Sequence, residues 1–235
     1  MDRLAWARED QALMARATRY FEWQARLVKP ELGRRVVEVG CGTGNFTGHL
    51  LDHEFVIALD IESSFVERVR ERFPGRTNLH TLAASPGTDE FSALARFMPD
   101  SCVCLNVLEH IEDDAAALAS MASILRRGGS VVLMVPAFQA LYGPIDRNSG
   151  HFRRYTRGSL TRLAESVGLE VRSVRFMNSV GMLGWWMNAR VWRREKQSAG
   201  QIEFFDRWVV PAISRLEEVA PLPFGQSLLA VLTRP

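Results

Sequence analysis

Apolar strand-like segments alternate with helix-like segments along the first 136 residues, and this alternation restricts the possible folds more than any other feature. Short apolar runs predict buried strands over 35–40, 54–61, 78–84, 101–108 and 130–136. The stretches between them predict four helices. The first ends near Leu51, and the others cover 63–73, 90–98 and 113–129. Ser63 or Ser64 is the expected N-cap of the second helix. This order predicts an α/β fold with a parallel, doubly wound sheet and helices on both faces.

The remaining segments extend this core at both ends. Residues 2–28 read as one helix, and a long loop over 137–156 follows the fifth strand. A helix, a sixth strand over 169–177, a tryptophan-rich helical segment and a seventh strand over 226–233 complete the chain. We find no internal repeat or low-complexity linker. We therefore predict a single domain, 1–235. It consists of a helical cap (1–33), a cofactor-binding core (34–177), a helical insertion (178–223) and a last strand (224–235).

Composition and charge exclude some classes of protein. The net charge is +2 and the hydrophobic fraction 47%, which is ordinary for a globular chain and too weakly basic to predict a nucleic-acid partner. The charged N-terminus lacks the apolar segment of a signal peptide, and no apolar run is long enough to span a membrane. Three cysteines without a framework spacing fit a reduced, cytoplasmic protein. Cys102 and Cys104 have no histidine partners nearby in sequence, so we predict no metal site.

Three glycines spaced two residues apart follow the first strand in VVEVGCGTGNF: Gly40, Gly42 and Gly44. Glycines at this point of an α/β sheet let the backbone approach a nucleotide-like ligand. The dinucleotide fingerprint G-x-G-x-x-G/A requires glycine or alanine where Asn45 stands, which argues against a nicotinamide-dependent dehydrogenase. The sequence also lacks the G-x-x-x-x-G-K-[ST] run of a phosphate-binding loop.

The stretch VVEVGCGTG resembles motif I of the class I S-adenosylmethionine-dependent methyltransferases. Asp60 lies 20 residues after Gly40, where this family has an acidic residue that accepts hydrogen bonds from both ribose hydroxyls. CLNVLEHIEDD is similar to the family's fourth-strand segment, and LRRGGSVVLMVP to its turn into the fifth strand, with Arg127 where proline is common. The resemblance covers residues 36–176. It implies a Rossmann-like sheet of seven strands, with the last strand antiparallel beside the sixth and the flanking helices as a lid.

The same resemblance implies S-adenosylmethionine as the cofactor. The residues expected to bind it are Tyr20, Glu38, Gly40, Cys41, Gly42, Gly44, Asp60, Ile61, Ser85, Asn106 and Val107. The chain departs from the family where an acidic residue often reads the adenine amino group after the third strand. Ala83, Ala84 and Ser85 stand there, so Ser85 or a backbone carbonyl would take that contact.

Two polar clusters are expected near the ends of the fourth and fifth strands, where the methyl acceptor would lie. We predict His110, His151, Asp146 and Tyr155 as catalytic residues. Asp146 precedes His151 by five residues and could orient it, and histidine exchanges protons near neutral pH. Our hypothesis is that His110 or His151 is the general base or a substrate anchor; the alternative is that each histidine only packs or fixes its loop. The loop ALYGPIDRNSGHFRRYT resembles that of small, bacterial-type biosynthetic members of the family.

Aromatic and basic residues indicate where an acceptor would bind. The predicted acceptor-binding residues are Trp23, Glu109, Tyr142, Arg153, Arg154 and Trp186. We expect Tyr20, Phe21 and Trp23 to cover the active site, and Trp185, Trp186 and Trp192 to line an apolar pocket or a dimer face. Core packing is the alternative for these aromatic residues, and contact with a membrane surface is a weaker one. Eleven basic residues against four acidic ones over 146–196 predict either a solvated face or a site for an anionic group.

These features predict an enzyme that moves a methyl group from S-adenosylmethionine to an O, N or C nucleophile of a small molecule, such as a secondary-metabolite or other biosynthetic intermediate. The alternative is a protein that binds S-adenosylmethionine without transferring methyl, such as a cyclase or a regulatory module. A nucleic-acid methyltransferase is disfavoured, because NVLEH stands where amino-methylating enzymes of that class have an Asn-Pro-Pro-aromatic motif. The chain is expected to be a monomer or a homodimer.

Overall fold

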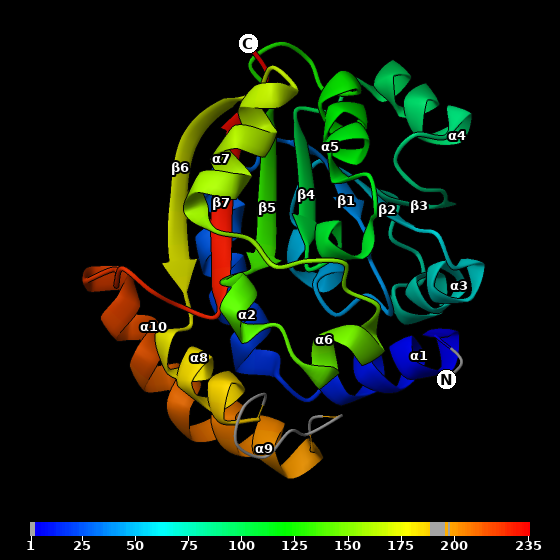
Figure 1. Cartoon of the computed structure of the whole chain (residues 1–235). Coiled ribbons are helices and arrows are strands. Elements are labelled where there is room, and N and C mark those ends of the chain that lie inside the picture. The colour runs from blue at the N-terminus through cyan, green and yellow to red at the C-terminus, as the bar shows by residue number, and fades with distance from the viewer. Residues whose placement is uncertain (1–2, 189–195, 197) are drawn as a thin grey trace.

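The computed structural model describes residues 3–188, 196 and 198–235. A seven-stranded sheet forms its centre, in the order β3-β2-β1-β4-β5-β7-β6 (Figure 1). The strands are β1 Arg35–Val39, β2 Phe55–Asp60, β3 Leu79–Ala83, β4 Ser101–Leu105, β5 Ser130–Pro136, β6 Glu170–Met177 and β7 Ser227–Thr233. Strand β7 pairs antiparallel with both β5 and β6, whereas the other pairs are parallel. The predicted fold, with its antiparallel last strand beside the sixth, is confirmed.

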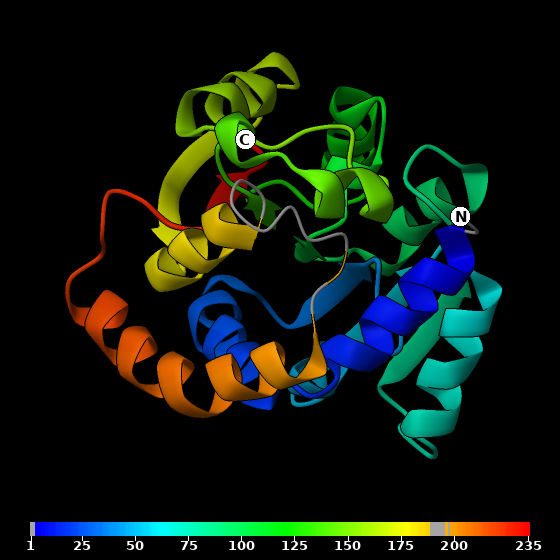
Figure 2. The same ribbon diagram turned by 60° about the horizontal axis from the view of Figure 1, so that its bottom comes forward.

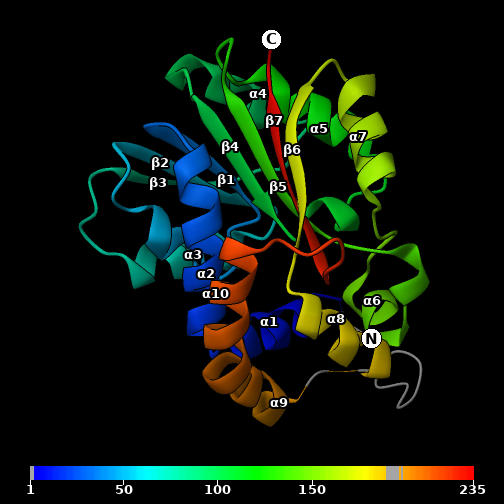
Figure 3. The same cartoon turned by 90° about the vertical axis from the view of Figure 1, so that its left-hand side faces the viewer.

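Helices cover both faces of the sheet. They are α1 Arg3–Met14, α2 Thr18–Val28, α3 Ser63–Arg72, α4 Asp89–Ser92, α5 Asp114–Ser123, α6 Pro144–Ser149, α7 Arg157–Ser166, α8 Ser179–Trp186, α9 Ala199–Phe204 and α10 Val210–Val219. Figure 3 shows α2 and α10 on one face and α5 and α7 on the other. In the described part of the chain, no helix is long and apolar enough to cross a membrane.

Alternation along the strands produces two hydrophobic cores, one on each face. Val37 and Cys102 pack toward α5 and α7 in one cluster, while their neighbours Val36 and Val103 pack with Trp23 of α2 in the other. Successive strand residues point to opposite faces, and both faces are covered, so the strands are apolar throughout. In β5, all seven residues from Ser130 to Pro136 are buried. This double burial explains why apolar runs located the strands so well in the sequence.

Several details of the predicted helices are wrong. The helix expected over 113–129 ends at Ser123, and the segment 90–98 forms the end of α4 and a 3-10 helix, Ala93–Phe97. Residues 2–28 form two helices, because the chain turns after Met14, where the N–H of Ala17 donates to the Met14 carbonyl at 2.8 Å. Only a 3-10 helix, Thr47–Leu50, follows the glycine loop. The N-cap position of α3 is Glu62, whose side chain makes no capping hydrogen bond, so neither Ser63 nor Ser64 has that role.

Candidate active site

A cavity of about 1030 Å³ opens at the carboxyl ends of the parallel strands. Ligand sites in proteins usually measure roughly 300–1,000 Å³, so this one has room for a cofactor and a second molecule. Its floor is the end of β1, β2 and β4, at the point where the strand order reverses. Figure 2 shows α1, α8 and α9 around this end of the sheet, and all three contribute lining residues.

The glycine loop after β1 turns sharply at the cavity floor. Gly40, Gly42 and Gly44 have φ angles of +76°, +50° and +82°, a region that suits glycine. A Cβ on Gly40 would lie 2.2 Å from Cγ2 of Val107, so no other residue fits there without movement. The backbone N–H groups of Gly40 and Cys41 both donate to the carbonyl of Leu59, at 2.8 and 2.9 Å. The loop is thereby fixed against the end of β2.

Asp60 ends β2 beside this loop and is 9% exposed. Its Oδ2 accepts a hydrogen bond from the N–H of Gly42 at 2.9 Å, and its Oδ1 accepts one from the N–H of Glu62 at 3.1 Å. Each carboxylate oxygen has a second lone pair for a ligand hydroxyl. Burial raises the pKa of Asp60, although the backbone N–H of Glu62 partly offsets that rise. Ile61 lines the cavity next to it and is 73% exposed, which leaves an apolar surface for a flat ring.

Glu38 places a second buried carboxyl under the loop. It lines the cavity and accepts a hydrogen bond from the hydroxyl of Thr47 at 2.6 Å. Burial raises its pKa to about 7, because a charged carboxylate is poorly solvated there and Asp60 adds further negative charge. Cys41 and Ser85 also line the cavity, and burial raises the pKa of the Cys41 thiol.

The end of β4 supplies the next part of the lining. Asn106 has a φ of +55°, and its N–H donates to the carbonyl of Met134 at 2.7 Å, which turns the chain into the cavity. Asn106, Val107, Glu109 and His110 all line the cavity. Glu109 is 1% exposed, and its Oε2 accepts no hydrogen bond from any residue that the structure describes. Burial raises the pKa of Glu109 to about 7, and His151 partly offsets this rise.

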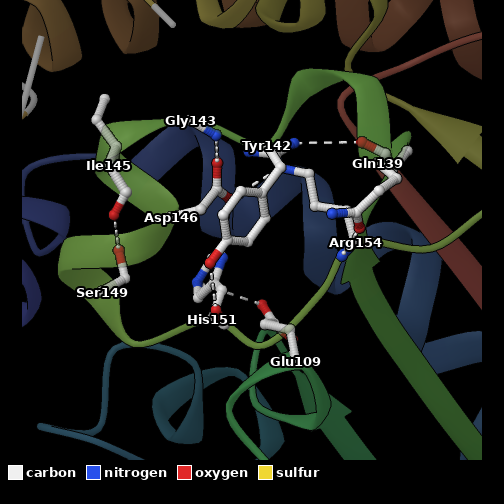
Figure 4. Close-up of polar contacts among 10 residues, drawn as sticks. Glu109, Gln139, Tyr142, Gly143, Ile145, Asp146, Ser149, His151 and Arg154 are labelled. Atoms are coloured by element: carbon white, nitrogen blue, oxygen red, sulfur yellow. Dashed lines mark hydrogen bonds and ion pairs between the residues drawn. The ribbon is translucent and has the colours of Figure 1, made fainter. Parts of the chain in front are cut away.

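The loop after β5 brings a charged network to the opposite wall (Figure 4). Oδ1 of Asp146 lies 2.9 Å from Nδ1 of His151 and 2.8 Å from Nε of Arg154. Its Oδ2 accepts the N–H of Gly143 at 2.8 Å, which ties the start of α6 to the same carboxylate. Burial acts to raise the pKa of Asp146, but the hydrogen bond from His151 and the charge of Arg154 lower it overall. Asp146 is therefore a carboxylate that fixes His151.

The two predicted histidines meet in the cavity. Their ring centroids lie 4.5 Å apart in an edge-to-face arrangement. Nε2 of His151 faces Oε1 of Glu109 at 4.0 Å, which is beyond hydrogen-bond distance. The structure thus brings the two predicted clusters together, with Glu109 and His110 from the turn after β4 and Asp146 and His151 from the loop after β5.

Other predicted residues lie outside the cavity lining. Asp146 is one of them, and it contacts His151, which does line the cavity. Four more have clear physical reasons. Trp23 of α2 is completely buried in the hydrophobic core between this helix and the sheet, so it does not cover the site. Tyr155 is buried, and its hydroxyl donates to Oδ2 of Asp114 at 2.8 Å. Arg153 pairs with the same Asp114 at 2.7 Å. The hydroxyl of Tyr142 donates to the carbonyl of His151 at 2.7 Å, so Tyr142 supports the loop from behind.

The structure also revises the aromatic and basic predictions. Trp186 is 49% exposed and does not line the cavity, whereas Trp185 is buried and does, with the guanidinium of Arg154 4.7 Å from its ring centroid. Gly44 packs against Phe73 instead of facing the cavity. Trp192 lies outside the described residues. Among the described basic residues of 146–196, four are paired with acidic residues: Arg153, Arg154, Arg172 and Lys196.

Several lining residues carried no sequence signal. Helix α1 contributes Trp6, Asp10 and Gln11, and Asn45 donates to the Gln11 carbonyl at 3.1 Å, which seats this helix on the glycine loop. Burial raises the pKa of Asp10 to about 6, a rise that His151 opposes. Because these contacts join residues far apart in sequence, no local pattern in α1 indicated them.

A polar group lines the wall formed by α2, α8 and β7. The hydroxyl of Tyr20 contacts Ser227, Gln24 and Asn178, and all four residues line the cavity. Asp206, in the π-helical turn Phe205–Val209, accepts the N–H groups of Arg19 and Tyr20 at 3.3 and 2.8 Å. This carboxylate satisfies the free N-terminal N–H groups of α2 and thereby fixes Tyr20. Of these residues, only Tyr20 was predicted.

Comparison with known proteins connects this geometry to a family. A family model described as a methyltransferase domain matches residues 7–174. An S-adenosylmethionine-dependent methyltransferase of Mycolicibacterium smegmatis is 32% identical over 151 residues, which cover 62% of this chain and 56% of that protein. A ubiquinone biosynthesis O-methyltransferase of Ralstonia nicotianae is 27% identical over 62% of this chain and 67% of that protein. The chain thus spans little more than half the length of the first relative.

Solved structures share the fold at low sequence identity. A chain from the complex between the Haloferax volcanii Trm112 methyltransferase activator and a methyltransferase is 18% identical, with a TM-score of 0.66 and coverage of 98% of this chain and 95% of that chain. The N-methyltransferase NodS of Bradyrhizobium japonicum, in complex with S-adenosylhomocysteine, is 19% identical with a TM-score of 0.53, over 87% of this chain and 79% of that one. The chain belongs to the methyltransferase domain family, among the class I S-adenosylmethionine-dependent methyltransferases.

Proposed function

We propose that the protein transfers a methyl group from S-adenosylmethionine to a nucleophilic O, N or C atom of a small biosynthetic intermediate. The observation that carries this proposal is His151, which lines the same cavity as the glycine loop while its Nδ1 lies 2.9 Å from Oδ1 of Asp146. One wall of the cavity then holds the donor, and the other holds a group that accepts a proton. Helices α1, α8 and α9 line the space between them.

The donor would lie along the ends of β1, β2 and β4. The loop around Gly40 and Gly42 would hold its methionine part, with Glu38 and Tyr20 nearby. Asp60 would accept the ribose hydroxyls with its remaining lone pairs, because a carboxylate suits a vicinal diol. Exposed Ile61 and the backbone near Ser85 would contact the adenine, while Asn106 and Val107 close the cofactor side.

The chemical step would be an in-line displacement at the sulfonium methyl. A lone pair of the acceptor atom forms a bond to the methyl carbon, the carbon–sulfur bond breaks, and its electron pair stays on sulfur as S-adenosylhomocysteine. The acceptor proton passes to Nε2 of His151, since Nδ1 is engaged by Asp146 at 2.9 Å. The buried carboxylate of Asp146 then stabilises the imidazolium, with Arg154 holding that carboxylate in place. Alignment of the reactants supplies most of the remaining rate enhancement.

The acceptor side of the cavity favours a partly apolar molecule. Trp185, Phe205 and Met187 line it together with the polar group around Tyr20 and Asn178. The similar protein of Ralstonia nicotianae is a ubiquinone biosynthesis O-methyltransferase, which supports oxygen as the acceptor atom and a biosynthetic role. An apolar body with one or two polar groups would satisfy both kinds of lining.

A second candidate is a protein that uses bound S-adenosylmethionine without transferring methyl. The [4+2]-cyclase SpnF shares the fold with a TM-score of 0.58 at 16% identity, over 90% of this chain and 80% of that one. A cyclase of this kind would use the same cavity but would leave the sulfonium methyl in place.

The two candidates are separated by following the methyl group. Protein supplied with methyl-labelled S-adenosylmethionine and a panel of phenols, hydroxy acids and amines should release S-adenosylhomocysteine and a labelled product. His151→Ala should lower that turnover by about 10²–10⁴-fold, and the matched change of exposed His80 to Ala should not. Unaltered donor in every reaction, despite tight S-adenosylhomocysteine binding, would favour the non-methylating alternative.

A further inference from the structure

Glu109, His110 and His151 form a compact cluster at the acceptor end of the cavity. Each residue offers one ligand atom, and these atoms all lie within 4.8 Å of one another. Atoms bound to one cation at about 2.0–2.3 Å lie roughly 3–4.5 Å apart, so small side-chain rotations would bring the three into a coordination sphere. The 4.0 Å gap between Nε2 of His151 and Oε1 of Glu109 is too long for a hydrogen bond but suits two ligands of one ion.

The carboxyl of Glu109 gives an independent indication of a bound ligand. Its side chain is 1% exposed and lines the cavity. Oε2 accepts no hydrogen bond from any residue in the described parts of the chain. Leaving a buried carboxyl oxygen without a partner costs free energy, and a cation at this position would remove that cost.

The contacts of His151 have the form expected of a metal ligand. Histidines that bind metals commonly donate the second ring N–H to a carboxylate, which fixes the ring and its tautomer. Here Nδ1 lies 2.9 Å from Oδ1 of Asp146, so Nε2 is the nitrogen directed toward Glu109. Arg154 lies near the cluster, but its charge is balanced by Asp146 at 2.8 Å. Asp10, which also lines the cavity, adds negative charge beside His151.

We propose that Glu109, His110 and His151 bind a divalent transition-metal cation, such as Mn²⁺ or Zn²⁺, at the acceptor end of the active-site cavity. Two imidazoles and one carboxylate suit such ions better than Mg²⁺, which prefers oxygen ligands. Three protein ligands leave coordination positions free, and these positions face the cavity. The sequence did not predict this metal site, because its three ligands come from two distant segments of the chain.

The role of the cation deepens the proposed function and rests on it. An acceptor that carries an oxygen donor could occupy the free coordination positions, which would narrow the acceptor atom from O, N or C to oxygen. This would change one part of the step proposed above. A bound cation would lower the pKa of the acceptor hydroxyl, so its proton would leave to water, and His151 would serve as a ligand in place of the base. The methyl transfer itself then proceeds from the bound oxygen as described above.

The test is direct metal binding by tag-free protein that has been stripped with a chelator. Isothermal titration with MnCl₂ or ZnCl₂, and the electron paramagnetic resonance signal of Mn²⁺, should show one ion per chain. Glu109→Gln and His151→Ala should each weaken the affinity at least 100-fold, whereas His80→Ala should leave it unchanged. His80 is an exposed histidine on β3, so it controls for adventitious binding to imidazole.

S-adenosylhomocysteine titration of the same samples separates this proposal from the proposed function. Variants that lose the metal but still bind S-adenosylhomocysteine are folded, and they support the site. Wild-type protein that binds S-adenosylhomocysteine but binds Mn²⁺ and Zn²⁺ no more tightly than His151→Ala would overturn the metal site and leave the proposed function standing. Wild-type protein that binds the metal but not S-adenosylhomocysteine would support the metal site and overturn the proposed function.

Discussion

The two ends of the cavity are built in different ways. The cofactor end comes mainly from residues 38–61, one strand–loop–strand unit whose parts are fixed by backbone hydrogen bonds between Gly40, Cys41 and Leu59. The acceptor end gathers α1, the β4 end, the loop after β5, α8 and α9 (Figures 1 and 2). Side-chain contacts connect several of these segments. Asp206, for example, reaches Tyr20 across 186 residues of sequence.

This difference shows which parts of a binding site a sequence motif can predict. A motif records local requirements, such as glycines in a left-handed conformation before a helix or strand. The acceptor end has few local requirements, because its geometry depends on charged side chains that find partners on other elements. We therefore expect substitutions at the cofactor end to change donor binding, and substitutions at the acceptor end to change stability and acceptor chemistry.

The largest effect on stability is expected at Asp146. Asp146→Asn would leave the guanidinium of Arg154, whose side chain is 1% exposed, without its counter-charge. Breaking a buried pair in this way costs about 3–5 kcal/mol. Urea unfolding should show this loss. S-adenosylhomocysteine affinity of the folded fraction should stay within about twofold, because the donor site lies elsewhere in the cavity.

The matched control for Asp146 is a surface ion pair. Glu203 lies 2.6 Å from Arg16, and both side chains are 53% exposed. Glu203→Gln should change the free energy of unfolding by no more than about 1 kcal/mol. A comparable loss in both variants would contradict the distinction between buried and exposed pairs.

A smaller effect, dependent on pH, is expected at Glu38 of the cofactor end. Burial raises the pKa of Glu38 to about 7 in the folded protein, from an ordinary value of 4.5. Between these two pH values, the folded state therefore binds more protons at Glu38 than the unfolded state does. The contribution of Glu38 to the free energy of unfolding is then greatest below pH 4.5 and falls until about pH 7. Relative to Glu38→Gln, wild type should lose about 3 kcal/mol over this window. Parallel stability curves for the two proteins would refute the shift.

The donor site is tested next at Asp60. Asp60→Ala removes the carboxylate proposed to accept the ribose hydroxyls and should weaken S-adenosylhomocysteine binding by about 100-fold, or about 2.7 kcal/mol. Isothermal titration measures this change. Asp52→Ala is the control, since Asp52 forms a surface pair with Lys29 at 2.6 Å. If His151→Ala weakened donor binding as strongly as Asp60→Ala, the proposed separation of the two ends would fail.

The smallest effect is expected at Asp206, which joins the insertion to α2. Asp206→Ala removes a carboxylate that accepts two N-terminal N–H groups of α2. Loss of such a cap costs about 1 kcal/mol, which lowers the melting temperature by about 2–4 °C in a chain of this size. Differential scanning calorimetry can resolve this shift. An unchanged melting temperature would mean that water replaces the carboxylate without loss.

The sequence by itself determined the sheet and the donor site. All seven strands were located to within a few residues, because strands buried on both faces form continuous apolar runs between polar stretches. Gly40, Gly42 and Asp60 are part of the resemblance that implied S-adenosylmethionine as the cofactor, and these residues meet local needs of the loop and of the β2 end. Two polar clusters, one with His110 and one with His151, were expected near the ends of the fourth and fifth strands, because strand ends in a parallel sheet converge on one edge.

Only the tertiary structure decided which side chains enter the acceptor end. Trp23 and Trp185 are both tryptophans in helices, yet Trp23 is in the core and Trp185 lines the cavity. Asp10, Gln24, Asn178 and Asp206 gave no signal, because their partners lie on other elements of the fold. Side-chain burial is set by how helices pack against the sheet, and that packing depends on the whole chain at once. A local motif can specify a backbone turn, but it cannot specify which distant residues will surround it.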